Sequence, residues 1–105
     1  YKILEAINKE YRKINLLIIE FHNISKNIVK IKKFLSNSKF KIIHLHANNY
    51  GGVDKFKNPN VIEVTLINSK KFFVNKKKST RKYPLIGLDF KNLKRREDIK
   101  IKFND

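Results

Sequence analysis

The stretch from Phe40 to Asn68 predicts two strands joined by a polar turn, and it constrains the fold more than any other part of the chain. Residues 40–45 alternate around an apolar, β-branched spine, residues 48–60 gather Asn, Gly, Asp and Pro, and residues 61–67 are apolar except at Glu63 and Thr65. Apolar segments on either side of a cluster of turn residues are typical of strands in a domain interior. We therefore expect both strands to be largely buried.

The first of these strands carries two histidines near its end. Successive side chains in an extended chain point to opposite faces of the sheet, so His44 and His46 should point the same way. The alternation predicts one face with Phe40, Ile42, His44 and His46, and the other with Lys41, Ile43, Leu45 and Ala47.

The preceding residues predict helix, strand and helix. Residues 1–14 carry apolar side chains at helical spacing, and so do residues 28–35, for which Ser25 is the expected N-cap. Between them the continuous apolar run Leu16 to Phe21 is typical of an interior strand, and we expect it to be the most buried element. A strand, a helix and a strand form a parallel crossover unit. The connection through residues 48–60 lacks helical periodicity, which favours an antiparallel return for the third strand.

The remainder of the chain is polar and strongly basic. The run Lys76 to Lys78 predicts a solvated loop, and Tyr83 to Phe103 predicts an extended arm laid over the domain, with a short last strand at Ile99 to Phe103. The organisation expected is a single partial domain over 1–105. Residues 1–68 would form the core, and residues 69–105 the basic loop and the C-terminal arm.

The net charge of +16 raises the question of a nucleic-acid partner. Lysine supplies 21 of the 25 basic residues, which together with abundant Ile and Asn is the bias of an AT-rich coding sequence. The four arginines offer few of the bidentate contacts that readers of bases and phosphates use. The composition therefore disfavours nucleic acid, while a small basic module that binds nucleic acid or another polyanion stays as the alternative.

Further classes of protein are limited by what the chain lacks. The longest apolar run, residues 14–21, falls well short of the roughly 20 residues of a membrane span. There is no cysteine, which agrees with a reducing compartment, and we expect a cytoplasmic protein. There is also no methionine and the sequence starts at Tyr1, so we expect a piece of a longer protein.

Polar side chains gather at the predicted strand ends, which is where ligands bind in open α/β sheets. The candidate set is Glu20, His22, His44, His46, Asn48, Asn49, Tyr50 and Glu63. A neutral histidine oriented by a carboxylate could act as general base toward a substrate hydroxyl. The same residues also allow two other interpretations: His44 and His46 could share a metal with Glu63 or Glu20, and Asn-Asn-Tyr-Gly-Gly could be only a turn.

Three stretches in this order and spacing resemble the last part of an FkbM-type S-adenosylmethionine-dependent methyltransferase. They are IIEFHNI (18–24), IIHLHANNYGG (42–52) and NPNVIEVTLIN (58–68), and the tail YPLIGLDFKN (83–92) resembles the closing segment of that family more loosely. The resemblance implies a class I, Rossmann-like α/β sheet. This chain would supply its fifth, sixth and seventh strands, with the seventh antiparallel and between the other two. It also implies methyl transfer from S-adenosylmethionine to a hydroxyl, on a small molecule or a sugar or glycan-precursor acceptor.

The resemblance does not extend to the cofactor site. The family's glycine-rich turn and acidic motifs would all lie upstream of Tyr1, and no residue of this chain is assigned to cofactor binding. By resemblance, Glu20, His22 and His46 are the candidate catalytic residues. The candidate substrate-binding residues are His44, Asn48, Asn49, Tyr50 and Glu63.

Two expectations follow for the isolated chain. It should be inactive and should not bind S-adenosylmethionine, and the strand Leu16 to Phe21 should lie at an open edge of the sheet. An apolar edge with unpaired backbone groups tends to pair with another chain, so we expect self-association through it or further protein covering it.

Overall fold

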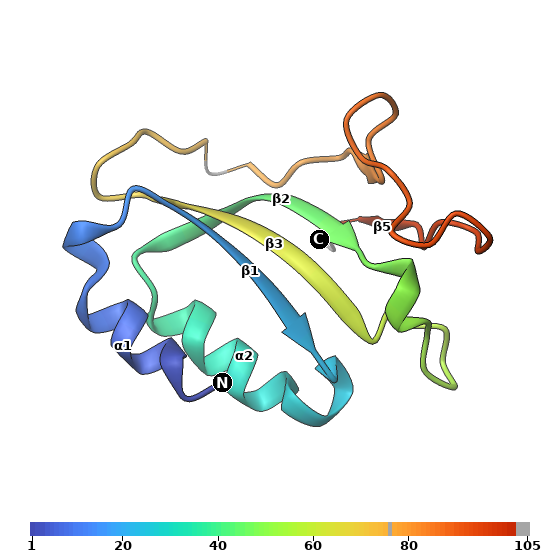
Figure 1. Ribbon diagram of the computed structural model, residues 1–105. Coiled ribbons are helices and arrows are strands. Elements are labelled where there is room, and N and C mark those ends of the chain that lie inside the picture. The colour runs from blue at the N-terminus through green and yellow to red at the C-terminus, as the bar shows by residue number, and fades with distance from the viewer. Residues whose placement is uncertain (76, 103–105) are drawn as a thin grey trace.

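The computed structural model describes residues 1–75 and 77–102, which form a small mixed α/β domain (Figure 1). The main elements in chain order are helix α1 (Ile3–Lys9), the 3-10 turn η1 (Tyr11–Lys13), β1 (Leu16–His22), α2 (Ile24–Asn37), β2 (Phe40–Ala47), the 3-10 turn η2 (Asn49–Gly51) and β3 (Val61–Asn68). Two short strands follow, β4 (Lys82–Tyr83) and β5 (Ile101–Lys102). Phe103, where we expected the last strand to end, and Lys76 of the basic run lie outside the described residues.

The central feature is a three-stranded sheet in the order β1-β3-β2. β3 is antiparallel to both neighbours, with Leu16 opposite Ile67 on one side and Phe40 opposite Asn68 on the other. β1 and β2 are therefore parallel to each other, as expected for two strands connected through a helix. The antiparallel return of the third strand, and its place between the other two, are confirmed.

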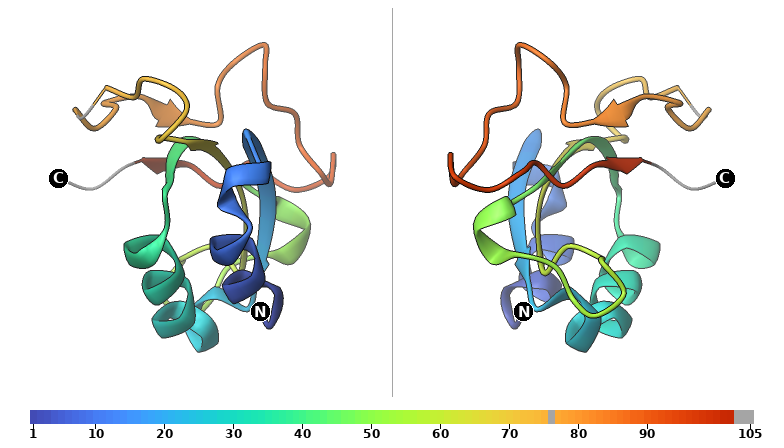
Figure 2. Two further views of the ribbon diagram at one scale, coloured as in Figure 1. Left: turned by 90° about the vertical axis from the view of Figure 1, so that its left-hand side faces the viewer. Right: turned by 90° about the vertical axis from the view of Figure 1, so that its right-hand side faces the viewer.

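The two helices cover one face of this sheet (Figures 1 and 2). The buried core between helices and sheet consists of Leu4, Ile7, Phe21, Ile31, Phe34, Phe40, Val64 and Leu66. Helix α2 begins at Ile24 and is preceded by Asn23 in the left-handed conformation at φ 51°, which Asn adopts more readily than most residues. The expected cap at Ser25 is therefore wrong, because the chain leaves β1 through Asn23 and Ser25 already lies in the first helical turn.

The predicted alternation along β2 is wrong in its first half. The pairing with β3 shifts between Ile42 and His44, which leaves Ile43 as the extra residue of a β-bulge. The bulge reverses the alternation, so Phe40 and Ile42 pack into the core together with Leu45 instead of sharing a face with the histidines. His44 and His46 do share a face, and it is the face away from the helices.

β1 is the most exposed of the three long strands, which overturns the expectation that it is the most buried element. Phe21 is its one buried residue, while Leu16 and Ile18 are at least half exposed on the face away from the helices. The physical reason is its position. Among residues 1–75 and 77–102, no strand pairs with the outer edge of β1, and the part of its face around Leu16 and Ile18 has little cover.

The chain beyond β3 lies on the side of the sheet opposite the helices, as Figure 2 shows. β4 and β5 form a separate two-stranded antiparallel pair beside β2, and residues 84–100 between them are the C-terminal arm. The short last strand that we expected at Ile99 to Phe103 begins only at Ile101 and is described as far as Lys102. No helix in the described part of the chain is both long and apolar enough to cross a bilayer.

Candidate functional site

A row of three ionisable side chains crosses the sheet near the carboxyl ends of β1 and β2. Glu63 on the central strand lies directly opposite Glu20 on one side and His46 on the other. Residues directly opposite each other in an antiparallel pair project from the same face, so all three lie on the face away from the helices. Two carboxylates and an imidazole are thereby aligned within one sheet row.

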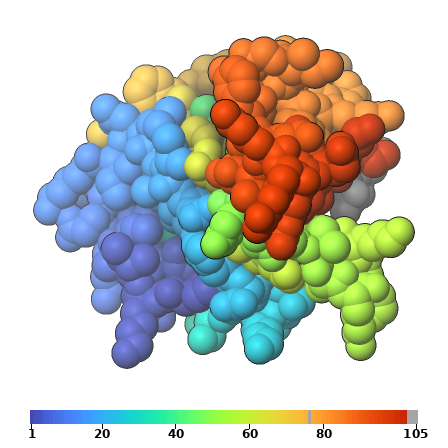
Figure 3. All heavy atoms as spheres, turned by 45° about the vertical axis from the view of Figure 1, so that its right-hand side comes forward, coloured from blue at the N-terminus to red at the C-terminus, as the bar shows by residue number. Residues whose placement is uncertain are grey.

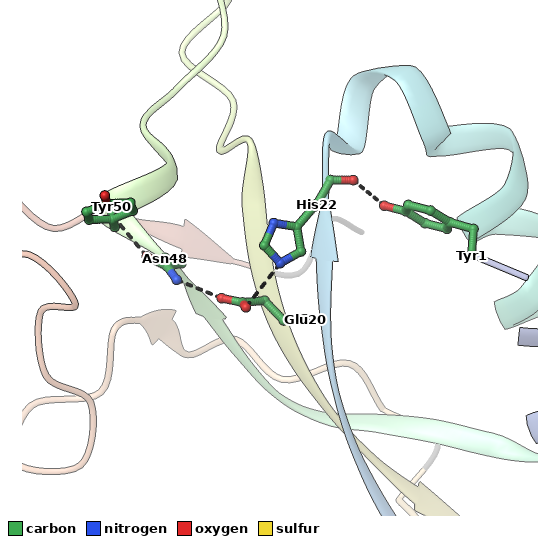
Figure 4. Close-up of polar contacts among 5 residues, drawn as sticks. All are labelled: Tyr1, Glu20, His22, Asn48 and Tyr50. Carbon is green, nitrogen blue, oxygen red and sulfur yellow. Dashed lines mark hydrogen bonds and ion pairs between the residues drawn. The ribbon is translucent and has the colours of Figure 1, made fainter. Parts of the chain in front are cut away.

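Glu20 is the centre of a short hydrogen-bonded chain at the end of this row (Figure 4). Its Oε1 accepts a bond of 2.6 Å from the side-chain amide of Asn48, and its Oε2 lies 3.2 Å from Nε2 of His22. The side-chain oxygen Oδ1 of Asn48 accepts a bond of 3.0 Å from the backbone amide of Tyr50. One carboxylate therefore fixes both an imidazole from β1 and an amide from the end of β2.

The position of His22 is supported from the N-terminus of the chain. The Tyr1 hydroxyl donates to the backbone carbonyl of His22, and the Tyr1 ring stacks on Phe21 with a centroid distance of 6.1 Å. Partial burial raises the pKa of the Tyr1 phenol, which keeps it protonated and able to donate. The His22 side chain itself remains open to solvent at 61% exposure, so a substrate can reach the imidazole.

The two histidines of β2 differ in their surroundings. The Nε2 atom of His46 is buried and has no hydrogen-bond partner among the described residues. His44 Nε2 lies 2.8 Å from the carboxylate of Asp89 in the arm, and its ring meets Tyr83 edge to face at 5.1 Å. Asp89 is almost fully buried in this contact. His44 is thus engaged by the arm, whereas His46 has an unused polar atom.

Asn49 anchors the arm to the end of β2. Its buried side chain donates to the backbone carbonyls of Leu93 at 3.0 Å and Arg96 at 3.1 Å, and it accepts from the Leu93 amide at 2.8 Å. Arg96 in return donates to the Tyr50 carbonyl at 3.0 Å. Asn49 therefore points into the arm, while Tyr50 next to it is largely exposed.

The structure divides the predicted site residues into two groups. Five of them lie together on one face at the carboxyl ends of β1 and β2, namely Glu20, His22, His46, Asn48 and Glu63. Tyr50 lies beside this group, and His44 and Asn49 hold the arm. Among residues 1–75 and 77–102 there is no group of three or more His, Asp or Glu side chains placed to hold a metal ion. The arrangement with His44, His46 and a third acidic ligand is therefore not formed.

Sequence reasoning missed three residues that shape the site: Tyr1, Asp89 and Arg96. Asp89 had a usable signal, because it is the only acidic residue between positions 70 and 96. Such an isolated acid in a basic segment indicates an internal partner. The hydrogen bonds of Tyr1 and Arg96 are to backbone carbonyls, and no residue pattern indicates these.

The arrangement around Glu20 suits proton transfer. If Nε2 of His22 carries the proton toward Glu20, Nδ1 is left as a free acceptor, since it has no partner in the described chain. A carboxylate that orients an imidazole in this way also stabilises the imidazolium that forms when the ring takes up a proton. The cluster can therefore deprotonate a hydroxyl that reaches His22.

Comparison with known proteins gives no assignment, since no family model, no curated protein and no solved structure matches the chain.

Proposed function

We propose that this chain is the C-terminal portion of an FkbM-type, S-adenosylmethionine-dependent O-methyltransferase. The single observation that supports this most is the sheet order β1-β3-β2, with the last strand antiparallel and between the two parallel ones. The resemblance of the sequence implies that order for the last three strands of a class I methyltransferase. The acceptor would be a hydroxyl of a sugar or glycan precursor, and the enzyme would be cytoplasmic.

The placement of the candidate residues supports the same proposal. Glu20, His22 and Asn48 form a connected group at the carboxyl ends of two parallel strands, which is where open α/β sheets bind their ligands. In the proposed mechanism His22 removes the proton of the acceptor hydroxyl while Glu20 orients the imidazole. S-adenosylmethionine, held by residues outside this chain, would supply the methyl group. Asn48, Tyr50 and Glu63 would orient the acceptor.

The exposed edge of β1 also supports an incomplete sheet. Leu16 and Ile18 leave apolar surface in water beside a row of unpaired backbone groups, an arrangement that native sheets usually cover or protect with charge. Here Glu20 is the one acidic residue of β1, and the strand has no lysine or arginine. In the complete enzyme we propose that a neighbouring strand of the same sheet pairs with this edge.

This edge predicts that the isolated 105 residues self-associate. Replacing Ile18 with lysine places a charge on the exposed apolar surface, and we expect the dissociation constant to rise about tenfold or more, because burial of one such side chain contributes about 1.5–3 kcal/mol. Sedimentation velocity over a concentration series measures this. The control Val29→Lys adds the same charge to an exposed position on α2 and should leave association unchanged. A wild-type chain that stays monomeric at high concentration would contradict the prediction.

The coding sequence before Tyr1 offers the simplest test of the proposed function. We expect it to encode a strand that ends in a glycine-rich turn, followed by acidic residues after later strands. An upstream segment without these features would refute the assignment.

The alternative, a small basic module that binds nucleic acid or another polyanion, is favoured by one observation, the net charge of +16. It predicts retention on heparin or DNA with a steep dependence on salt concentration, since each neutralised phosphate releases counterions. No retention at low salt, or retention that is indifferent to salt up to moderate concentration, would exclude it.

A further inference from the structure

The side of the domain opposite the helices exposes large apolar side chains within a strongly basic segment. These side chains come from the loop after β3 and from the arm, and they are Phe72, Phe73, Ile86, Leu88 and Phe90. Phe73 is 95% exposed and Ile86 is fully exposed. Both segments lie above the sheet on the same side of the molecule (Figures 1 and 2), and Figure 3 shows the arm in orange and red as a raised part of the surface.

The charge of this segment is almost entirely positive toward solvent. Residues 70–91 contain 8 of the 25 Lys and Arg residues of the chain and one acidic residue, Asp89. The Asp89 carboxylate is turned inward, where it accepts from the Leu85 backbone amide at 2.7 Å and contacts His44. Lys77 and Arg81 are exposed between the two groups of apolar side chains. The segment therefore presents exposed apolar side chains together with exposed cations.

We propose that this surface, formed by residues 70–75 and 77–91, binds the face of an anionic lipid bilayer. Lysines near such a bilayer are attracted by its negative surface potential, and exposed Phe, Ile and Leu side chains can insert at the boundary between headgroups and acyl chains. Electrostatic attraction and apolar insertion act together in this mode, and this surface offers both. The inference does not depend on the proposed methyltransferase activity.

The composition of the surface favours a bilayer over nucleic acid. Aromatic side chains can stack on bases, but Ile86 and Leu88 have no ring and would stay in water beside a nucleic acid. Lysine outnumbers arginine here, and lysine acts as a point charge without the bidentate geometry that suits phosphate and base recognition. A bilayer uses every one of these groups.

The experiment is co-sedimentation of the 105-residue chain with phosphatidylcholine vesicles, with and without a fraction of phosphatidylglycerol. We expect binding to the anionic vesicles only, weakening as salt is raised. The double variant Phe73→Ser/Ile86→Ser should bind about tenfold more weakly or worse, because each side chain loses its insertion into the apolar layer. The variant Lys77→Gln/Arg81→Gln should bind the anionic vesicles about 25-fold more weakly, at roughly fivefold for each charge.

Matched controls change the same residue types elsewhere. Phe56→Ser/Val29→Ser removes two exposed apolar side chains outside this surface, and Lys26→Gln/Lys30→Gln removes two exposed charges from α2. Both controls should bind within about twofold of wild type, as expected for surface substitutions away from a site. The proposal would be overturned if the chain did not bind anionic vesicles, or if the variants and the controls lost affinity equally. It would also be overturned if the chain bound vesicles and duplex DNA alike in a charge-dependent way and Phe73→Ser/Ile86→Ser did not weaken that binding.

Discussion

Replacing His22 with glutamine in the full-length product of the gene that encodes this chain is expected to lower kcat about 100-fold or more, because a general base contributes at least that factor. KM for the acceptor should change little, since in the proposed mechanism the imidazole acts only on the reacting proton. The fold should survive, because His22 is exposed and its carbonyl, which accepts from Tyr1, is retained. Radiolabelled methyl transfer under single-turnover conditions measures the effect.

The double variant His22→Gln/Glu20→Gln distinguishes a catalytic pair from two independent residues. In the proposed mechanism Glu20 acts through the imidazole, so the double variant should be no slower than His22→Gln alone. Glu10→Gln is the matched control, because Glu10 is an exposed acid whose ion pair with Lys13 at 2.6 Å lies near the other end of β1. Its kcat should stay within about twofold of wild type. A His22→Gln enzyme with near wild-type kcat would remove the histidine from the mechanism.

Replacing Asn49 with alanine is expected to lower the free energy of unfolding by about 3 kcal/mol, since it leaves the backbone amide of Leu93 and the carbonyl of Arg96 without partners and removes one of the two hydrogen bonds to the Leu93 carbonyl. The arm should loosen before the sheet does. Urea denaturation gives the total effect, and hydrogen exchange over residues 85–97 shows where it falls. Both are best measured in the Ile18→Lys background, where we expect the chain to be monomeric.

Asn92 supplies the control for this prediction within the same arm. Its side chain is exposed and makes no hydrogen bond with the described residues, so Asn92→Ala should change the stability by less than about 0.5 kcal/mol. Equal effects of the two substitutions would mean that Asn49 does not anchor the arm.

The sequence was sufficient for the order of the main elements and for the antiparallel return of the third strand, whereas the place of that strand between the other two was implied by the family resemblance. Apolar periodicity predicted the helices, and the polar connection before Val61 predicted the antiparallel return. These features follow from local residue pattern, so a single sequence reveals them. The same pattern brought Glu20, His22, His46, Asn48 and Glu63 to one place, because strand ends in a known sheet order must meet.

The errors lie where a single residue changes the strand geometry, or where the absence of a neighbouring segment determines burial. The bulge at Ile43 reverses the faces of β2, yet Ile42-Ile43 reads as ordinary alternation in the sequence. Burial of β1 was predicted from its apolar composition, but burial depends on what covers a strand, and little covers Leu16 and Ile18 here. The arm is attached through two contacts, His44 with Asp89 and Asn49 with Leu93. Each of them joins residues more than 40 positions apart.

Isothermal titration calorimetry with S-adenosylmethionine tests the central claim most directly, when it compares the full-length gene product with the 105-residue chain. We predict heat of binding with the full-length protein and none above background with the chain alone, because the glycine-rich turn and the acidic residues that hold the cofactor would lie outside these residues. Micromolar binding by the isolated chain, or no binding by the full-length protein, would contradict the assignment of this chain as the C-terminal portion of a methyltransferase.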